Sequence, residues 1–484
     1  MAKSDTLFLL IKSLNQAEKR YIKLFSNKNG TENKKYMQLF EAFVKYAKND
    51  IYQEELIETE LVGVIAKKNF SYEKNYLYQF ILKSLRNFHG QNTPRIQLQE
   101  LMINISLLYE RGLVKETLQL ISKAKKIAEK YDYDIQFLEI LLLERRITRQ
   151  FKRNETKTSL AQIQNESQKK LDRINQQLKI LDCYEDVFLE AKNFGASKII
   201  DEDLQIKIQR ILPLKIDSMN TSLEMKLYYH LTHSMYHYIS RDWKTRAEHL
   251  KAVLDYFEQN SFLLNDTQYQ ERYLSFLNNY INYCYAFGEE KELKEQIEVL
   301  ENWKAKSRAL NIQLEQYRFY GKMLYAFKRK RFDEMVELSP SLDELLKKYE
   351  ANLTLNRRLT FLFHMAAAFL LEKKFDDAEA KVNEIINQPK FENRTDIQIL
   401  ARIMRIILFF EKEILTLAEY ETTSATRYLK KSRNDNPTEK KILSFLRKLV
   451  SSPTPKVILN DFHDFLKDKK GYEEILYWVE RKVN

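Results

Sequence analysis

The segment "KKFDDAEAKVNEII" (residues 373–386) directly follows the apolar run "FLFHMAAAFLLE" (361–372). Side chains three and four residues apart share one face of an α-helix. The segment shows this spacing in four small or apolar side chains, Phe375, Ala378, Val382 and Ile385. Together the two stretches predict a helical hairpin whose turn lies at "EKKF" (372–375).

Similar turns occur elsewhere in the chain. "SRDW" and "KRKRF" match "EKKF", while "FGEE" and "RGLV" place Gly288 and Gly112 at the turn itself. The second helices of the hairpins are therefore expected to begin at residues 114, 243, 290, 332 and 375. Successive gaps are 129, 47, 42 and 43 residues, and 129 is three times 43. A period of this size is typical of stacked helical hairpins, because one hairpin cannot bury its apolar face alone.

Composition agrees with an all-α fold. The 484 residues include only 8 Gly and 7 Pro, the residues on which the turns between strands depend. The apolar runs fall well short of the roughly 20 residues that span a bilayer, and no cleavage site follows the short apolar patch near the N-terminus. The two cysteines, Cys183 and Cys284, form no disulfide framework or CxxC motif. We therefore expect a cytoplasmic protein that does not enter a membrane.

The long gap between residues 114 and 243 predicts two further hairpins between 134 and 222. Helical periodicity is clear there, but the turn signals are poor, and residues 157–194 are compatible with one long helix or with two. Near Phe332 the second helix is expected to break at Pro340, because proline removes a backbone donor and clashes with the preceding turn. Ser339 is then expected to cap a new helix.

The two ends of the chain differ from the middle. Residues 1–92 predict four or five shorter helices, with a loop at "SNKNGTEN" (26–33). Residues 412–484 are helical with interruptions at "RNDNP" and "SSPTPK". We therefore divide the chain into a basic N-terminal domain or cap (1–92), a repeat array (93–411) and a basic C-terminal cap (412–484), because repeat arrays need terminal units that close the exposed core.

The hairpins resemble tetratricopeptide repeats over roughly residues 96–390, although their period is nearer 43 residues than 34. That resemblance implies an α-solenoid with three core positions on each first helix: Leu101, Ile105, Leu108; His230, Ser234, His237; Leu277, Ile281, Cys284; Phe319, Met323, Ala326; Leu362, Ala366 and Phe369. It implies three more on the second helices: Thr117, Ile121, Ala124; Arg246, Leu250, Val253; Leu293, Ile297, Leu300; Ala378, Val382 and Ile385. "LNQAEKRYIKLF" (14–25) and "KNFSYEKNYLYQFILKSLRNF" (68–88) also resemble a bacterial group of tetratricopeptide-like proteins, a resemblance that implies no activity.

By the same resemblance, first-helix residues beside the core positions would line a concave groove for a peptide. Tyrosine offers a stiff contact surface with a hydrogen-bonding tip, and asparagine can bond an extended backbone. The alternative is that these residues only pack on neighbouring repeats. The residues concerned are Tyr228, Tyr238, Asn278, Asn282, Tyr285, Tyr317 and Tyr320.

Three histidines, His230, His233 and His237, are spaced so that they share one helical face, as a zinc site would require. His230 and His237, however, fall on core positions, and no thiol or carboxylate is arranged to complete a tetrahedron. We therefore predict imidazoles packed between helices, with no metal and no cofactor. No Gly-rich phosphate loop, HExxH or GxSxG motif occurs. A noncatalytic protein is expected, and a metal-dependent enzyme at this cluster is the third alternative.

The net charge of +12 is concentrated at the ends of the chain. Residues 427–456 carry a net charge of +7, and the first 90 residues carry +5. Basic residues in the C-terminal stretch could pair with phosphates, or could simply form a solvated face. The candidates are Arg427, Lys430, Lys431, Lys440, Lys441, Arg447 and Lys448.

These observations lead to one preferred function and one alternative. We expect a noncatalytic scaffold or adaptor that binds a protein or peptide in the groove of its repeats, with the basic ends steering acidic partners. The alternative is a nucleic-acid-associated regulator that holds phosphates with its basic terminal helices.

Overall fold

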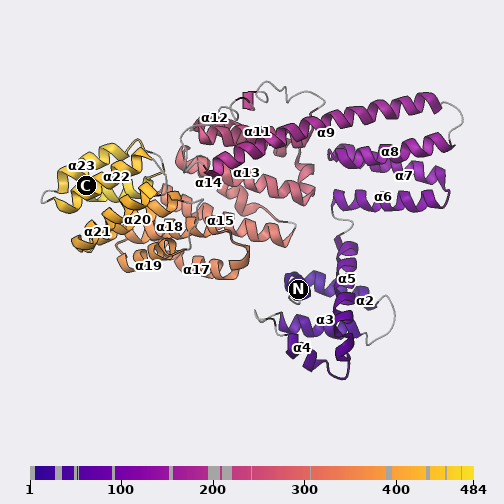
Figure 1. The fold of residues 1–484 in the computed structure, drawn as a ribbon, viewed down its shortest axis with the longest axis horizontal. Coiled ribbons are helices and arrows are strands. Elements are labelled where there is room, and N and C mark those ends of the chain that lie inside the picture. Colours follow the sequence, from indigo (N-terminus) through magenta and orange to yellow (C-terminus); the bar gives the residue numbers. More distant parts are fainter. Residues whose placement is uncertain are drawn as a thin grey trace. The chain divides into compact units, whose positions relative to one another are not determined.

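The computed structural model describes residues 6–27, 35–47, 52, 54–89, 93–151, 156–193, 206, 208–209, 221–240, 242–305, 307–388, 395–431, 436–452, 455–469 and 471–483. Within these residues the chain forms 23 α-helices and three short 3-10 helices, and no strand occurs in them. The predicted all-α fold is confirmed (Figure 1).

Contacts divide the chain into two compact units, and each is described by itself. The first comprises residues 1–171, 262–270 and 306–308, and the second comprises residues 172–261, 271–305 and 309–484. Both are built from helices that pack against their neighbours in the chain.

Five helices form the described part of the N-terminal module, which agrees with the number expected, but only the first four are short, since the fifth has 20 residues. They are α1 (Thr6–Ser13), α2 (Gln16–Asn27), α3 (Lys35–Tyr46), α4 (Glu54–Glu60) and α5 (Phe70–His89). Their shared core includes Ile11, Ile22, Leu39, Phe40 and Phe43, all of which are fully buried. Most of the loop predicted at 26–33 lies outside the described residues.

Helical hairpins follow. The first helices are α6 (Pro94–Glu110), α11 (Leu223–Ile239), α13 (Thr267–Ala286), α15 (Arg308–Lys328) and α18 (Leu355–Leu371). The second helices are α7 (Val114–Lys130), α12 (Trp243–Gln259), α14 (Glu290–Asn302), α16 (Phe332–Glu337) and α19 (Phe375–Ile386). All five predicted starts, at 114, 243, 290, 332 and 375, are confirmed.

Pairing of consecutive helices continues beyond residue 411. Another hairpin forms from α20 (Thr395–Glu411) and α21 (Leu415–Lys431), and it is followed by α22 (Pro437–Ser451), α23 (Pro455–Leu466) and α24 (Glu473–Val483). Figure 1 shows α18 to α21 side by side in the orange part of the chain. The second unit is therefore a solenoid of stacked antiparallel hairpins.

The turns between helices share one backbone geometry. Two residues before the next helix begins, the backbone takes the left-handed conformation at Gly112, Asp132, Lys330, Lys373 and Glu413. In each of these turns the following amide donates to the carbonyl five residues back, as Lys374 does to Phe369 over 2.8 Å. This is the Schellman arrangement, which satisfies the last carbonyls of the first helix. The repeat is thus more regular in its backbone than in its sequence.

The middle of the chain contains one helix of unusual length. Residues 157–194 were compatible with one helix or two, and a single 38-residue helix, α9 (Thr156–Asn193), is present. It follows α8 (Asp134–Phe151), and Lys170 on α9 bonds Asp134 over 3.0 Å. The second hairpin expected in this region would begin its second helix near residue 200, which lies outside the described residues.

The break predicted at Pro340 is present, but its cap is not the one expected. Helix α16 ends at Glu337, and α17 (Ser339–Lys348) begins with Pro340 in its first turn. Ser339 already belongs to α17, and the preceding Leu338 makes no side-chain capping bond. Because Leu338 keeps near-helical dihedrals, the chain bends without leaving a helical conformation, so a serine cap is not required.

Most of the core positions implied by the resemblance are buried. On the first helices eleven of fifteen are buried, and the half-buried exceptions are Leu101, Leu108, His230 and His237. On the second helices eleven of twelve are buried, the exception being the half-buried Arg246. The α18–α19 hairpin fits best, since all six of its core positions are buried.

Candidate functional site

The C-terminal helix α24 lies across the ends of successive hairpins of the second unit. Its residues Ile475, Trp478 and Val479 form a buried apolar stripe with helical spacing. At the α20–α21 turn, the indole nitrogen of Trp478 donates to Glu411 over 2.8 Å, and Lys482 forms an ion pair with the same carboxylate over 2.7 Å. The apolar stripe and the polar contacts together fix this helix on the array.

Two further turns contact α24. At the α18–α19 turn, the guanidinium of Arg481 donates to the carbonyl of Leu371 and lies 3.2 Å from the carboxylate of Glu372. At the α15–α16 turn, Lys330 forms an ion pair with Glu480 over 2.6 Å. One helix is therefore recognised by three consecutive turns.

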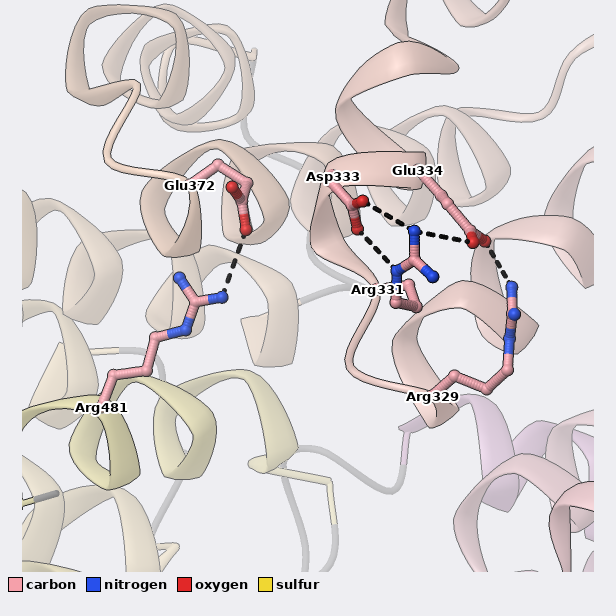
Figure 2. A network of polar contacts seen from close by, with 6 residues as sticks. All are labelled: Arg329, Arg331, Asp333, Glu334, Glu372 and Arg481. Atoms are coloured by element: carbon pink, nitrogen blue, oxygen red, sulfur yellow. Dashed lines mark hydrogen bonds and ion pairs between the residues drawn. The ribbon is translucent and has the colours of Figure 1, made fainter.

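Figure 2 shows the charged side chains at the α15–α16 and α18–α19 turns and Arg481 of α24. Arg481 extends from α24 toward Glu372, while Arg331 at the α15–α16 turn forms a bidentate pair with Asp333, with distances of 3.0 and 2.8 Å. Both Arg329 and Arg331 reach Glu334. The local arginines are thus paired with neighbouring carboxylates.

The beginning of α24 lies beside residues predicted to line the groove. Glu474 is only 5% exposed, and its carboxylate lies 3.0 Å from Nδ1 of His364 on α18. The ring of Tyr320 lies 5.9 Å from that of His364. Burial, followed by the charges of Glu474 and Glu473, raises the pKa of Tyr285. Tyr320 therefore neighbours the histidine that Glu474 of α24 contacts, and Tyr285 lies within electrostatic range of the same carboxylate.

None of the seven predicted groove residues is exposed. Asn278, Tyr317 and Tyr320 are buried, and Tyr228, Tyr238, Asn282 and Tyr285 are half-buried. Tyr320 donates to the side-chain oxygen of Asn282 over 3.0 Å, which joins α15 to α13. The guanidinium of Arg357 stacks on both Tyr317 and Tyr320. Packing between neighbouring repeats uses most of these side chains, so a peptide would reach them chiefly at their edges.

The more N-terminal members of the set also make contacts between helices. The ring centroid of Tyr228 lies 5.5 Å from that of Tyr184 of α9, and the guanidinium of Arg272 lies over the Tyr228 ring. Tyr238 contacts Trp243 edge to face at 5.7 Å. The hydroxyl of Tyr285, by contrast, is buried without a hydrogen-bond partner. Among the predicted groove tyrosines in the described chain, only Tyr285 has a buried hydroxyl without a hydrogen bond.

The basic residues show the opposite pattern. They lie on the packed helices α21 and α22, and all seven are exposed: Arg427, Lys430, Lys431, Lys440, Lys441, Arg447 and Lys448. Apart from Lys440, none of them forms an ion pair with a carboxylate of the described residues, whereas Lys330, Lys412 and Lys482 elsewhere in the unit are paired. The acidic Glu439 within this stretch is 3% exposed, and burial raises its pKa to about 8. The α21–α22 surface is therefore strongly positive.

The three predicted histidines do lie together, and a fourth joins them. His249 of α12 lies opposite α11, and its ring stacks on that of His233 with a centroid distance of 4.5 Å. One nitrogen from each of His233, His237 and His249 lies within 4.8 Å of the others. Sequence periodicity could not have found His249, because the signal relates residues within one helix and this contact crosses the hairpin.

Burial lowers the basicity of the cluster. Desolvation, followed by the neighbouring imidazoles, lowers the pKa of His233 to about 4 and that of His249 to about 3. Desolvation also lowers the pKa of His237, against an opposing effect of Asp242. His233 and His249 are therefore neutral at pH 7.

No helix in the described part of the chain is both long and apolar enough to cross a membrane. No known family model matches this chain, and neither a curated protein nor a solved structure is significantly similar to it.

Proposed function

We propose that the protein is a noncatalytic helical-repeat scaffold of the tetratricopeptide-like class, whose second unit binds an amphipathic helix of a protein partner. The observation that carries this proposal is the docking of α24: the turns of three successive hairpins make polar contacts with one helix. A helix bound in this way presents apolar residues at spacings of three and four, which is the usual mode of helix-in-groove recognition. A partner helix with the same pattern would compete with α24.

The proposal includes a cytoplasmic location. Its support is cysteine usage: the two cysteines, Cys183 and Cys284, are both buried and are not bonded to each other. Such usage is typical of proteins in a reducing compartment.

The test uses the full chain and a fluorescent peptide with the sequence of residues 471–483. The variant Trp478→Ala/Arg481→Ala loses the bond of Trp478 to Glu411 and those of Arg481 to Leu371 and Glu372, so α24 should detach part of the time. We expect this variant to bind the peptide at least about tenfold more tightly than the wild type, because an intramolecular competitor lowers apparent affinity by the fraction of sites that it occupies.

A scrambled peptide of equal composition is the control. Equal binding of both peptides, or no binding by a variant in which proteolysis shows α24 to be released, contradicts the proposal. A physiological partner should then co-purify from the native cell after nuclease treatment at moderate salt, and should be enriched by the same double variant.

A second function is favoured by a separate observation. The seven basic side chains on α21 and α22 are all exposed, and their positive charge would suit a nucleic-acid backbone. The replacement of Lys440, Lys441, Arg447 and Lys448 by alanine should then abolish binding to arbitrary duplex DNA. It should also lower the slope of log affinity against log salt by up to about four.

The matched control replaces four exposed lysines on other helices, Lys251, Lys291, Lys294 and Lys322, by alanine. If both quadruple variants lose DNA binding equally, the attraction reflects the net charge of the chain and not this surface. DNA binding that survives high salt would also count against the second function.

A further inference from the structure

Histidine is concentrated in one hairpin of this protein. The chain has seven histidines, and four of them lie on α11 and α12: His230, His233, His237 and His249. Because the two helices are antiparallel neighbours, side chains from both enter the same space. Imidazole nitrogen is a common ligand of Zn²⁺, Ni²⁺ and Cu²⁺.

His233 is the centre of this group. It is 2% exposed, yet neither of its ring nitrogens has a hydrogen-bond partner. Its closest ring neighbours are Tyr229 at 4.3 Å and His249 at 4.5 Å between centroids. A buried polar group without a partner costs about 1–3 kcal/mol, and such a group in a native protein calls for an explanation. A cation between the rings would supply one.

In the two other rings Nδ1 lies close to a polar side chain. In His237 this nitrogen lies 3.4 Å from Oδ2 of Asp242, within ion-pair distance but without the alignment of a hydrogen bond. In His249 it lies 2.9 Å from Nδ1 of His230. Metal-ligating histidines characteristically direct their second nitrogen to a carboxylate or another hydrogen-bonding group. Nε2 of His237 and Nε2 of His249 therefore remain as the ligating atoms.

The cluster is open to solvent, but its rings must reorient before they can bind an ion. The side chain of His237 is 15% exposed, which opens the cluster to solvent. The rings of His233, His237 and His249 lie within 18° of parallel. Lone pairs lie in the ring planes, so the rings must rotate about their side-chain bonds before three nitrogens meet at the 2.0–2.1 Å typical of zinc.

We propose that His233, His237 and His249 bind one divalent transition-metal ion of the Zn²⁺ class, with Asp242 and His230 as positioning residues. Three histidines leave a fourth position for water or for His230. The proposal is independent of helix binding at α24, because the two regions share no residue.

The experiment uses the full chain expressed without a histidine tag and stripped with a chelator at pH 7.5. Zn²⁺ uptake is measured by equilibrium dialysis, and Co²⁺ serves as the spectroscopic probe because tetrahedral Co²⁺ absorbs visible light intensely and octahedral Co²⁺ weakly. We expect one ion per chain and a tetrahedral Co²⁺ spectrum. Either of two results overturns the proposal. One is that no ion is taken up, which would mean that only water bonds to the nitrogens of His233. The other is a weak, octahedral Co²⁺ spectrum.

Variants assign the ligands. His237→Gln and His249→Gln, both at half-buried positions, should lose the tetrahedral spectrum. Asp242→Asn should keep the spectrum and bind the metal about 10- to 100-fold more weakly, because mutation of a residue that bonds to a metal ligand typically has an effect of this size. The control is His463→Ala on α23, which should bind as the wild type does. Circular dichroism checks that each variant folds, and His230→Gln serves as a further positioning variant. Equal binding by the His463 and His237 variants would overturn the assignment.

Discussion

The α18–α19 and α11–α12 hairpins have the same backbone and different interiors. Both close with a bond from an amide to the carbonyl five residues back, Lys374 to Phe369 at 2.8 Å and Asp242 to His237 at 2.9 Å. In α18–α19 all six core positions are buried and none is charged, whereas α11–α12 has imidazoles at two positions and Arg246 at a third. The comparison shows that the turn and the helix spacing suffice to place a hairpin in the array.

The side chains in the interior of a hairpin can therefore differ from one repeat to the next. Natural proteins depart from local consistency mainly at functional sites. The α11–α12 hairpin departs from an apolar interior at the positions that gather four histidines, which is where we propose the metal site. Four measurements test whether the two hairpins differ only in their interiors.

The largest effect is expected in the apolar hairpin. Leu362 of α18 is fully buried, so Leu362→Ala should lower the free energy of unfolding by about 2–5 kcal/mol, through lost burial and the cavity left behind. Urea unfolding monitored by circular dichroism measures it. Leu417→Ala, at a 43% exposed position of α21, is the control and should change stability by less than about 0.5 kcal/mol. If Leu362→Ala and Leu417→Ala lowered the free energy of unfolding equally, Leu362 could not be a core residue.

A buried carboxyl outside both hairpins tests whether polar groups carry a cost generally. Burial raises the pKa of Glu439 to about 8, above its ordinary value of 4.5, so the unfolded chain releases this proton first. Stability should therefore fall as pH rises from about 5 to about 8, and the decline attributable to this group should amount to about 2–4 kcal/mol.

Glu439→Gln isolates that contribution, because glutamine does not titrate. The variant should lose the decline, so that its unfolding free energy exceeds that of the wild type by more at pH 8 than at pH 5. The same pH dependence in the variant and the wild type would mean that the carboxyl is already ionised in the folded protein.

The imidazole hairpin should respond in the opposite direction to the apolar one. His233→Leu replaces an unpartnered buried polar ring by an apolar side chain, and should raise the free energy of unfolding by about 1–3 kcal/mol in metal-free buffer. Thermal and urea unfolding with a chelator present measure the change. Destabilisation without metal would show that the ring packs better than its unsatisfied nitrogens suggest.

The smallest effect concerns what the two hairpins share. The side chains of Ser222 and Thr354 accept bonds from backbone amides and cap α11 and α18. Ser222→Ala and Thr354→Ala should each cost about 1 kcal/mol. Lys374→Ala, at an N-cap that makes no side-chain bond, is the matched control and should cost less than about 0.5 kcal/mol. A large difference between the two caps would mean that the hairpins differ in more than their interiors.

Local signals predicted the hairpins well. Five helix starts follow from recurring residues at turns and from apolar spacing within single helices, and both signals extend over only a few residues. The turns at Asp132 and Glu413 were not predicted, because they contain no glycine and the next helices begin at Asp134 and Leu415, without the aromatic residue that marks the turns before Phe332 and Phe375. Ser339 was expected to cap a helix because serine is a common cap, but the helical dihedrals of Leu338 remove the need for one.

The sites depended on contacts that a linear pattern does not contain. Periodicity identified His230, His233 and His237, yet not His249 on the adjacent helix. The groove residues were predicted from family positions, and their burial and bonds to neighbouring repeats follow from stacking. The seven basic residues were predicted from composition, and the structure places all of them on exposed faces.

Sequence alone therefore determined the helices, their pairing into hairpins and the charge of the C-terminal surface, because propensity, turn chemistry and charge are properties of neighbouring residues. Tertiary structure decided that α24 returns to three distant turns, that a fourth histidine joins the cluster and that the groove tyrosines pack inward. These results depend on which surfaces meet when hairpins stack, and the free energy of that packing is shared among residues far apart in the chain.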